Sequence, residues 1–228
     1  MTEDRSDDPS ADDPHSALDA RARQTDARRF SPSIARNRDA VRAVFLQHML
    51  AEGTLLEIAS GTGEHGAHIA PGLPGLDWWY SDIDADGRAS QAAWASHLGP
   101  GAGLKGPLRI DVSAGSWGEA DALAPFDAMF CANMLHIAPF AAAQGLMAGA
   151  GQRLRQGGRM MVYGPFARHG EMAPSNQRFS DDLKSRDPDW GVRDLDREIG
   201  PLARAAGLAL VEVVEMPANN LSVIFERE

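Results

Sequence analysis

The stretch that decides the fold reads TLLEIASGTGEHG and covers residues 54–66. Its first five residues are mostly apolar, as in a buried strand, and Gly61 and Gly63 follow in a tight turn. Residues 64–70 then predict a short helix that ends at Pro71. A strand, a glycine turn and a helix in this order are typical of the first unit of a parallel α/β sheet.

The following sequence continues this alternation of strands and helices. Apolar residues at helical spacing predict a helix over residues 33–50, with Gly53 just beyond as its stop. Strands are predicted at residues 77–80, 108–112, 126–132 and 159–163, with helices at 87–98 and 139–155. This order predicts one domain with a parallel sheet that is covered on both faces.

The C-terminal part departs from that order. Residues 208–215 and 221–225 both predict strands, and only a short segment separates them. A parallel crossover needs roughly a dozen residues or more, so these two strands must run antiparallel. The predicted fold is therefore α/β, with a mostly parallel seven-stranded sheet closed by a C-terminal antiparallel hairpin.

The charge of the chain is concentrated at its start. The 228 residues carry a net charge of −10, and residues 1–20 hold seven acids and one base. We expect an acidic disordered tail over residues 1–30 and a folded domain over residues 31–228. The chain has no basic stripe that would release counterions from a phosphate backbone, which argues against a nucleic-acid partner.

Several other classes of protein are disfavoured by composition. No apolar run approaches the roughly 18 residues of a membrane span, and the polar start is unlike a signal peptide. A single cysteine, Cys131, excludes an internal disulfide and a cysteine-based zinc site. The histidines His65, His68 and His136 have no metal-site spacing. We expect a cytoplasmic protein without a metal or a membrane partner.

The glycine turn fits two kinds of ligand. Residues 61–66 match the G-x-G-x-x-G pattern, and Asp82 lies 21 residues after Gly61, as in a nicotinamide-dependent oxidoreductase. Glu57 argues against that class, because a pyrophosphate beside a buried carboxylate is unfavourable. A ligand with an ammonium group would pair with Glu57 instead.

S-adenosylmethionine is such a ligand, since it carries an amino group and a sulfonium but no phosphate. Glu57 would hold its amino group, Asp82 its ribose hydroxyls and Asp111 its adenine amino group, because successive parallel strands end at one rim. Asp82 and Asp111 also fit simpler roles as a helix N-cap and a loop cap, although Asp84 is the better N-cap candidate. The predicted cofactor-binding residues are Glu57, Ala59, Gly61, Gly63, Asp82, Ile83, Asp111, Val112 and Asn133.

From about Phe30 to its end the chain resembles class I S-adenosylmethionine-dependent methyltransferases, and more narrowly a bacterial and eukaryotic family of methyltransferase-like proteins of unknown function. The resemblance is carried by residues 36–38, 56–65, 81–84, 133–137, 163–166, 175–176, 187–194 and 216–221. It implies a Rossmann-like three-layer sandwich and a cofactor site at Glu57, Gly61, Gly63, Asp82 and Asp111. It supplies no substrate.

Methyl transfer needs an aligned acceptor and needs a base only when the acceptor arrives protonated. His136, just after the fourth strand, is the candidate base, with a histidine bonded to loop backbone as the alternative. Tyr163 is the second candidate catalytic residue and is expected to line the acceptor pocket. Arg36, Asn176 and Asn219 are predicted to bind the acceptor, although each also fits a turn or capping role.

The type of acceptor is indicated by residues 133–136. They read NMLH, whereas amino-group methyltransferases of nucleic-acid bases or glutamine resemble one another in an Asn-Pro-Pro-aromatic motif. We therefore expect a small-molecule acceptor. A non-catalytic module that binds the cofactor and acts through partners is a third hypothesis, because a fold does not establish a reaction. The sequence leaves the oligomeric state open.

Overall fold

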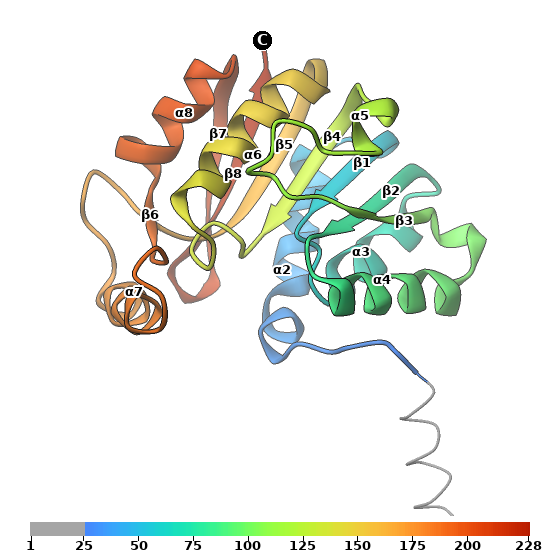
Figure 1. The fold of residues 1–228 in the computed structure, drawn as a ribbon, viewed down its shortest axis with the longest axis horizontal. Coiled ribbons are helices and arrows are strands. Elements are labelled where there is room, and N and C mark those ends of the chain that lie inside the picture. Colours follow the sequence, from blue (N-terminus) through green and yellow to red (C-terminus); the bar gives the residue numbers. More distant parts are fainter. Residues whose placement is uncertain (1–25) are drawn as a thin grey trace, which may run out of the picture.

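The structure, a computed structural model, describes residues 26–228. A central sheet lies between two layers of helices (Figure 1). Seven strands follow the order β3-β2-β1-β4-β5-β8-β7, and a short strand, β6, pairs with the end of β5. The strands are β1 (Glu52–Ile58), β2 (Gly75–Asp82), β3 (Leu104–Arg109), β4 (Phe126–Ala132), β5 (Leu154–Ala167), β6 (Arg193–Asp194), β7 (Leu208–Met216) and β8 (Asn220–Arg227).

The strand directions confirm the predicted architecture. The pairs β1–β2, β2–β3, β1–β4 and β4–β5 are parallel, whereas β8 runs antiparallel to both β5 and β7. The helices are α2 (Pro32–His48), α3 (Glu64–Ile69), α4 (Ala85–Leu98), α5 (Ala120–Leu123), α6 (Phe140–Arg153), α7 (Pro174–Arg186) and α8 (Gly200–Ala205).

The core divides between the two faces of the sheet, because successive side chains of a strand point to opposite faces. Leu55 of β1 packs with Phe45 of α2 and Ile69 of α3 on one face. The next residue, Leu56, packs with residues of α6 and α8 on the other face. A strand that is buried on both faces is normally apolar along its whole length. A carboxyl group near the end of such a strand is therefore unusual.

The structure corrects several of the predicted elements, among them the fifth strand, which was predicted at residues 159–163 and spans Leu154–Ala167. The third strand was predicted at residues 108–112 but spans Leu104–Arg109, because it continues through the turn-like pair Gly106 and Pro107. The first helix ends at His48, and Gly53 already belongs to β1. The structure also contains two helices that the sequence did not predict, α7 and α8.

The segment before α2 contacts the domain as well. The ring of Phe30 packs edge-on against Trp94 of α4, with 5.3 Å between ring centroids. The backbone N–H of Arg29 donates to Ser90 Oγ at 2.8 Å. Ordered contacts therefore begin before the predicted domain start at residue 31. The rest of the predicted tail, residues 1–25, lies outside the described residues.

The carboxyl ends of the parallel strands meet at the edge of the sheet where α7 and the start of α2 lie (Figure 1). The chain moves from β1 to β2 and β3 on one side and returns to β4 and β5 on the other, so this edge is the switch point at which such sheets bind ligands. Among residues 26–228, no helix is both long and apolar enough to cross a membrane. The same residues hold no cluster of His, Cys, Asp or Glu suited to a metal ion.

Candidate functional site

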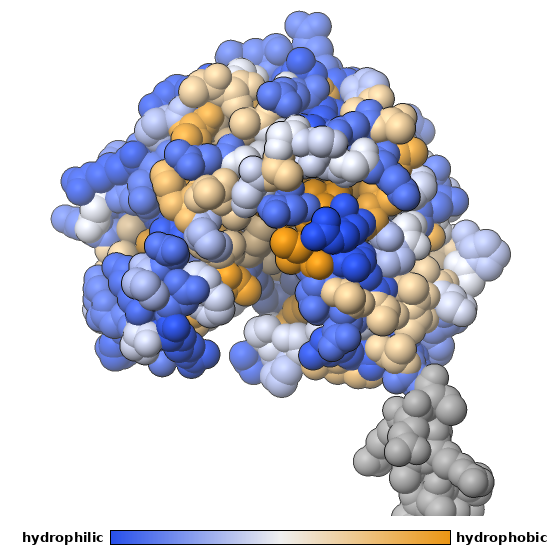
Figure 2. All heavy atoms as spheres, viewed as in Figure 1, coloured by the Kyte–Doolittle hydropathy of each residue, from blue (hydrophilic) through white to orange (hydrophobic). Residues whose placement is uncertain are grey.

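A cavity of about 560 Å³ opens at this edge. Figure 2 shows the surface hollowed between α7 and the start of α2, with apolar residues beside the hollow. Loops after β1, β2, β3 and β4 line the cavity, together with the N-terminal segment and one residue after α7. Its principal lining residues are Ser31, Ser33, Ile34, Glu57, Ala59, Gly61, Thr62, His65, Asp82, Ile83, Ile110, Asp111, Val112, Asn133, Met134, Ile137 and Trp190.

Glu57 is the most unusual of these residues. It stands one residue before the end of β1, is 1% exposed, and accepts one hydrogen bond from Trp78 Nε1 at 2.8 Å. Burial raises the pKa of its carboxyl to about 8, and the charge of Asp82 adds to the rise. Among residues 26–228, no lysine or arginine lines the cavity to pair with it. A ligand cation would stabilise the ionised form of Glu57.

The two glycines of the loop have different roles. Gly61 adopts φ 55°, and a Cβ placed on it would meet no atom within 4 Å, so its place beside the cavity is left open. Gly63, at φ 84°, begins α3, and a Cβ there would lie 3.2–3.3 Å from Gln91 and Trp94. Gly61 therefore leaves room for a ligand, whereas Gly63 leaves room for α4.

Asp82 holds the glycine loop in place. Its Oδ2 accepts the N–H of Gly61 at 2.8 Å and its Oδ1 accepts the N–H of Asp84 at 2.9 Å. Asp84 caps α4 by accepting the N–H of Gly87 at 2.8 Å. The sequence-based preference for Asp84 as the N-cap of α4 is thus confirmed. Asp82, the last residue of β2, lines the cavity.

Asp111 is a loop cap that also lines the cavity, and its contact with adenine stays a prediction. It lies two residues beyond β3, lines the cavity, and accepts the N–H of Ser113 at 2.9 Å as a loop cap. Ala59 and Asn133, which follow β1 and β4, both adopt left-handed backbone conformations, with φ of 54° and 60°. Such conformations are unfavourable for these residues and cluster at ligand sites.

The two predicted catalytic residues lie outside the lining of the cavity. The His136 ring is buried 5.4 Å from the ring of Phe179 on α7, and burial lowers its pKa to about 4. The Tyr163 hydroxyl accepts a hydrogen bond from Asn220 Nδ2 at 3.1 Å. Burial raises the pKa of Tyr163. Their catalytic roles stay predictions.

Of the three residues predicted to bind the acceptor, Asn176 and Asn219 are hydrogen-bonded to each other. Arg36 is exposed on α2. Asn176 Nδ2 donates to the backbone oxygen of Asn219 at 2.8 Å, and Asn219 Nδ2 donates to Ser175 Oγ at 2.9 Å. These bonds join α7 to the β7–β8 hairpin. None of the three lines the cavity, so their part in acceptor binding stays a prediction.

Several residues that line the cavity were not predicted from the sequence. They include Ser31, Ser33 and Ile34 at the start of α2, His65 on α3, and Trp190. His65 stands inside the quoted stretch and could have been found there, as a buried histidine next to a ligand loop. The others reach the cavity through tertiary packing, which leaves no local pattern.

Comparison with known sequences identifies the family. A family described as "Protein of unknown function (DUF938)" matches residues 28–227. The chain belongs to this family. The match covers the domain from Arg28 through β8, and so includes every residue that lines the cavity.

Comparison with solved structures confirms the fold. The chain is similar to an O-methyltransferase family 2 protein from Planctomyces limnophilus in complex with apigenin (TM-score 0.72, 17% identity, 96% of this chain and 63% of that chain). It is similar to an O-methyltransferase family protein from Burkholderia thailandensis (TM-score 0.71, 18% identity, 93% of this chain and 61% of that chain). It is also similar to CalO1, a methyltransferase in calicheamicin biosynthesis, in its S-adenosylhomocysteine-bound form (TM-score 0.65, 18% identity, 83% of this chain and 54% of that chain).

These neighbours are longer than this chain, which spans 54–63% of their length. Their identities of 17–18% show a shared fold. The predicted Rossmann-like methyltransferase fold is therefore confirmed, and the neighbours that share it are methyltransferases.

Proposed function

We propose that the chain is an S-adenosylmethionine-dependent methyltransferase that acts on a small-molecule acceptor. The observation that carries the proposal is Glu57, a buried carboxyl group that lines the cavity without a cationic partner among the lining residues. The cofactor brings two positive groups and no phosphate, so it matches a cavity whose charged lining residues are all acidic.

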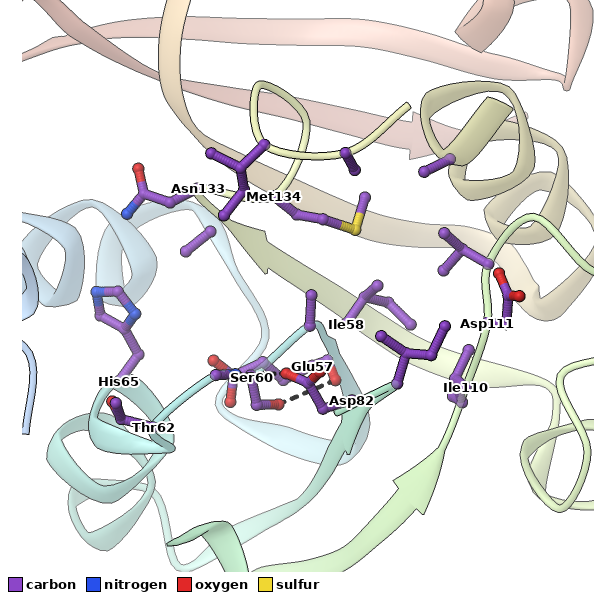
Figure 3. Close-up of a pocket in the computed structure, with 18 of the residues that line it drawn as sticks. Glu57, Ile58, Ser60, Thr62, His65, Asp82, Ile110, Asp111, Asn133 and Met134 are labelled. Carbon is purple, nitrogen blue, oxygen red and sulfur yellow. Dashed lines mark hydrogen bonds between the residues drawn. The ribbon is translucent and has the colours of Figure 1, made fainter. Parts of the chain in front are cut away.

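The residues around Glu57 fit the other parts of the cofactor. Gly61 leaves open space beside Glu57, where the methionine part would pass close to the backbone. Asp82 would accept the ribose hydroxyls with the lone pairs left by its two backbone donors. Asp111 and the apolar Val112 would hold the adenine at the other end of the cavity, where Figure 3 shows Asp111 beside Ile110.

The nicotinamide alternative fits the same loop less well. A dinucleotide places its pyrophosphate at the N-terminus of the helix that follows the glycine turn. Here Glu64, the first residue of α3, already accepts the N–H of Ser31 at 2.6 Å and the Thr62 hydroxyl at 2.8 Å. Its carboxyl group and that of Glu57 would both oppose a pyrophosphate.

The bound cofactor supplies an activated methyl group for an in-line displacement. The part of the chain is to fix the direction of approach and to exclude water. The apolar side chains of Ile34, Met134 and Ile137 in the cavity wall would exclude water. A small molecule fits a cavity of about 560 Å³, and apigenin in the Planctomyces limnophilus protein is an acceptor-sized example in a related fold.

The test uses S-adenosylmethionine with a tritiated methyl group and a panel of neutral, anionic and cationic small molecules. We expect label in a product with the wild type. Gly61→Val, which projects a side chain into the cavity, should abolish transfer and weaken S-adenosylhomocysteine binding more than about tenfold. Gly157→Val is the matched control, because Gly157 has φ 72° and equally open space but lies outside the cavity.

Two results would contradict the proposal. Cofactor binding without transfer to any compound would favour a non-catalytic module. Equal effects of the two glycine substitutions would show that backbone strain, and not a filled cofactor site, causes the loss.

A further inference from the structure

The cavity extends beyond the residues assigned to the cofactor, and this inference rests on that proposed function. Figure 3 shows Asp111 and Ile110 at one end of the cavity, Glu57 and Asp82 in the middle, and His65 and Asn133 at the other end. With adenine at Asp111 and the amino group at Glu57, the remaining end is the place for the acceptor. Seven lining residues that were not assigned to the cofactor are available to contact the acceptor: Ser31, Ser33, Ile34, His65, Met134, Ile137 and Trp190.

The hydrogen bonds of His65 define which of its nitrogens is free. His65 is 3% exposed, and its Nε2 lies 3.0 Å from Asn37 Oδ1. An amide oxygen can only accept a hydrogen bond, so the proton between these two atoms belongs to His65. Nε2 therefore carries the proton and donates, and Nδ1 keeps its lone pair.

Nδ1 has no hydrogen-bond partner among residues 26–228 of the structure, although the ring is buried at the wall of a cavity. Burial, and then the nearby charge of His68, lower the pKa of His65 to about 4. The ring is neutral at pH 7, so Nδ1 is an acceptor for an O–H or N–H group. An acceptor at the wall of a cavity can take a hydrogen bond from a ligand or from water.

Charge at this end of the cavity narrows the chemistry of the acceptor. None of these seven lining residues has a side chain that is charged at neutral pH, and four of them are large and apolar: Ile34, Met134, Ile137 and Trp190. An anionic acceptor would find no cation among them, and a cationic one would face the positive sulfonium. An uncharged molecule with an apolar body fits both conditions.

We propose that this end of the cavity binds an uncharged acceptor with an apolar body, and that His65 Nδ1 accepts a hydrogen bond from its nucleophilic O–H or N–H group. The acceptor oxygen or nitrogen forms a bond to the methyl carbon. The carbon–sulfur bond breaks, and its electron pair stays on sulfur as neutral S-adenosylhomocysteine. The proton of the acceptor is released to solvent, which balances the charge, and His65 Nδ1 orients the O–H or N–H group through its hydrogen bond.

The test is a calorimetric titration of protein saturated with S-adenosylhomocysteine, using three probes of one shape. These are 2-naphthol, which is uncharged and has a donor, 2-methoxynaphthalene, which is uncharged and has none, and the anion 2-naphthoate. We expect 2-naphthol to bind most tightly. His65→Phe keeps the bulk of the ring and should weaken 2-naphthol by about tenfold, the value of one buried hydrogen bond. It should leave 2-methoxynaphthalene and S-adenosylhomocysteine unchanged.

His97→Phe, an exposed change on α4, is the control and should alter none of the affinities. The proposal is overturned if 2-naphthoate binds as tightly as 2-naphthol, if His65→Phe weakens both uncharged probes equally, or if no probe binds the loaded protein. Failure of the protein to bind S-adenosylhomocysteine at all would instead overturn the proposed function, and this proposal with it.

Discussion

The raised pKa of Glu57 makes the stability of the free protein depend on pH in a defined way. Its pKa is about 8 in the folded protein and 4.5 in an exposed chain. Between these values the folded state binds a proton that the unfolded state has released, so stability falls as pH rises. The stabilisation is fully present below pH 4.5 and is lost as pH rises through 8.

Glu57→Gln removes this titration and keeps a side-chain oxygen for Trp78 Nε1. From the two pKa values, the wild type should lose about 4 kcal/mol between pH 5 and pH 9 relative to the variant. Roughly two thirds of that loss falls between pH 5 and pH 7. His65 and His136, whose pKa values burial lowers to about 4, titrate equally in both proteins, and their effects cancel in the difference.

The assay is urea denaturation without ligand, followed by far-ultraviolet circular dichroism at pH 5, 7 and 9. The quantity to compare is the difference in unfolding free energy between wild type and Glu57→Gln at each pH. A difference that stays constant from pH 5 to pH 9 would refute the reasoning, because it would mean that Glu57 titrates as an exposed carboxyl group.

Two further predictions concern hydrogen bonds that shape the site. Asp82→Asn gives the Gly61 and Asp84 N–H groups one side-chain acceptor in place of two, and should lower the unfolding free energy by about 1–3 kcal/mol in urea denaturation. An unchanged midpoint would contradict that role. Asn176→Ala removes the bond to the Asn219 oxygen, and should raise amide hydrogen exchange in α7 with a loss of about 1 kcal/mol. Exchange that stays at the wild-type rate would show that α7 is held by other contacts.

The sequence predicted the parts of the fold in which one strong pattern decides the structure. The strand at residues 126–132 has the predicted bounds, because an apolar run between polar turns leaves one choice. The antiparallel direction of β8 followed from the short connection that precedes it. The start of β3 was missed, since Gly106 and Pro107 look like a turn and tertiary pairing with β2 overrides that preference.

The site divides in a similar way. Glu57, Asp82 and Asp111 were predicted to share one rim because they follow parallel strands, and all three line one cavity. His136 also follows a strand, but its ring lies against Phe179 and does not line the cavity, which the spacing of the sequence does not reveal. His65 lines the cavity, and its ring is hydrogen-bonded to Asn37 of α2, a helix that lies earlier in the chain.

The most direct test of the central claim is calorimetric titration of the purified protein with S-adenosylmethionine, S-adenosylhomocysteine and NAD. We predict micromolar binding of the first two, weakened at least about tenfold by Glu57→Gln through loss of the ion pair with the amino group, and no binding of NAD. Binding of NAD alone, or cofactor binding that Glu57→Gln leaves unchanged, would contradict the assignment of this carboxyl group as the anchor of the site.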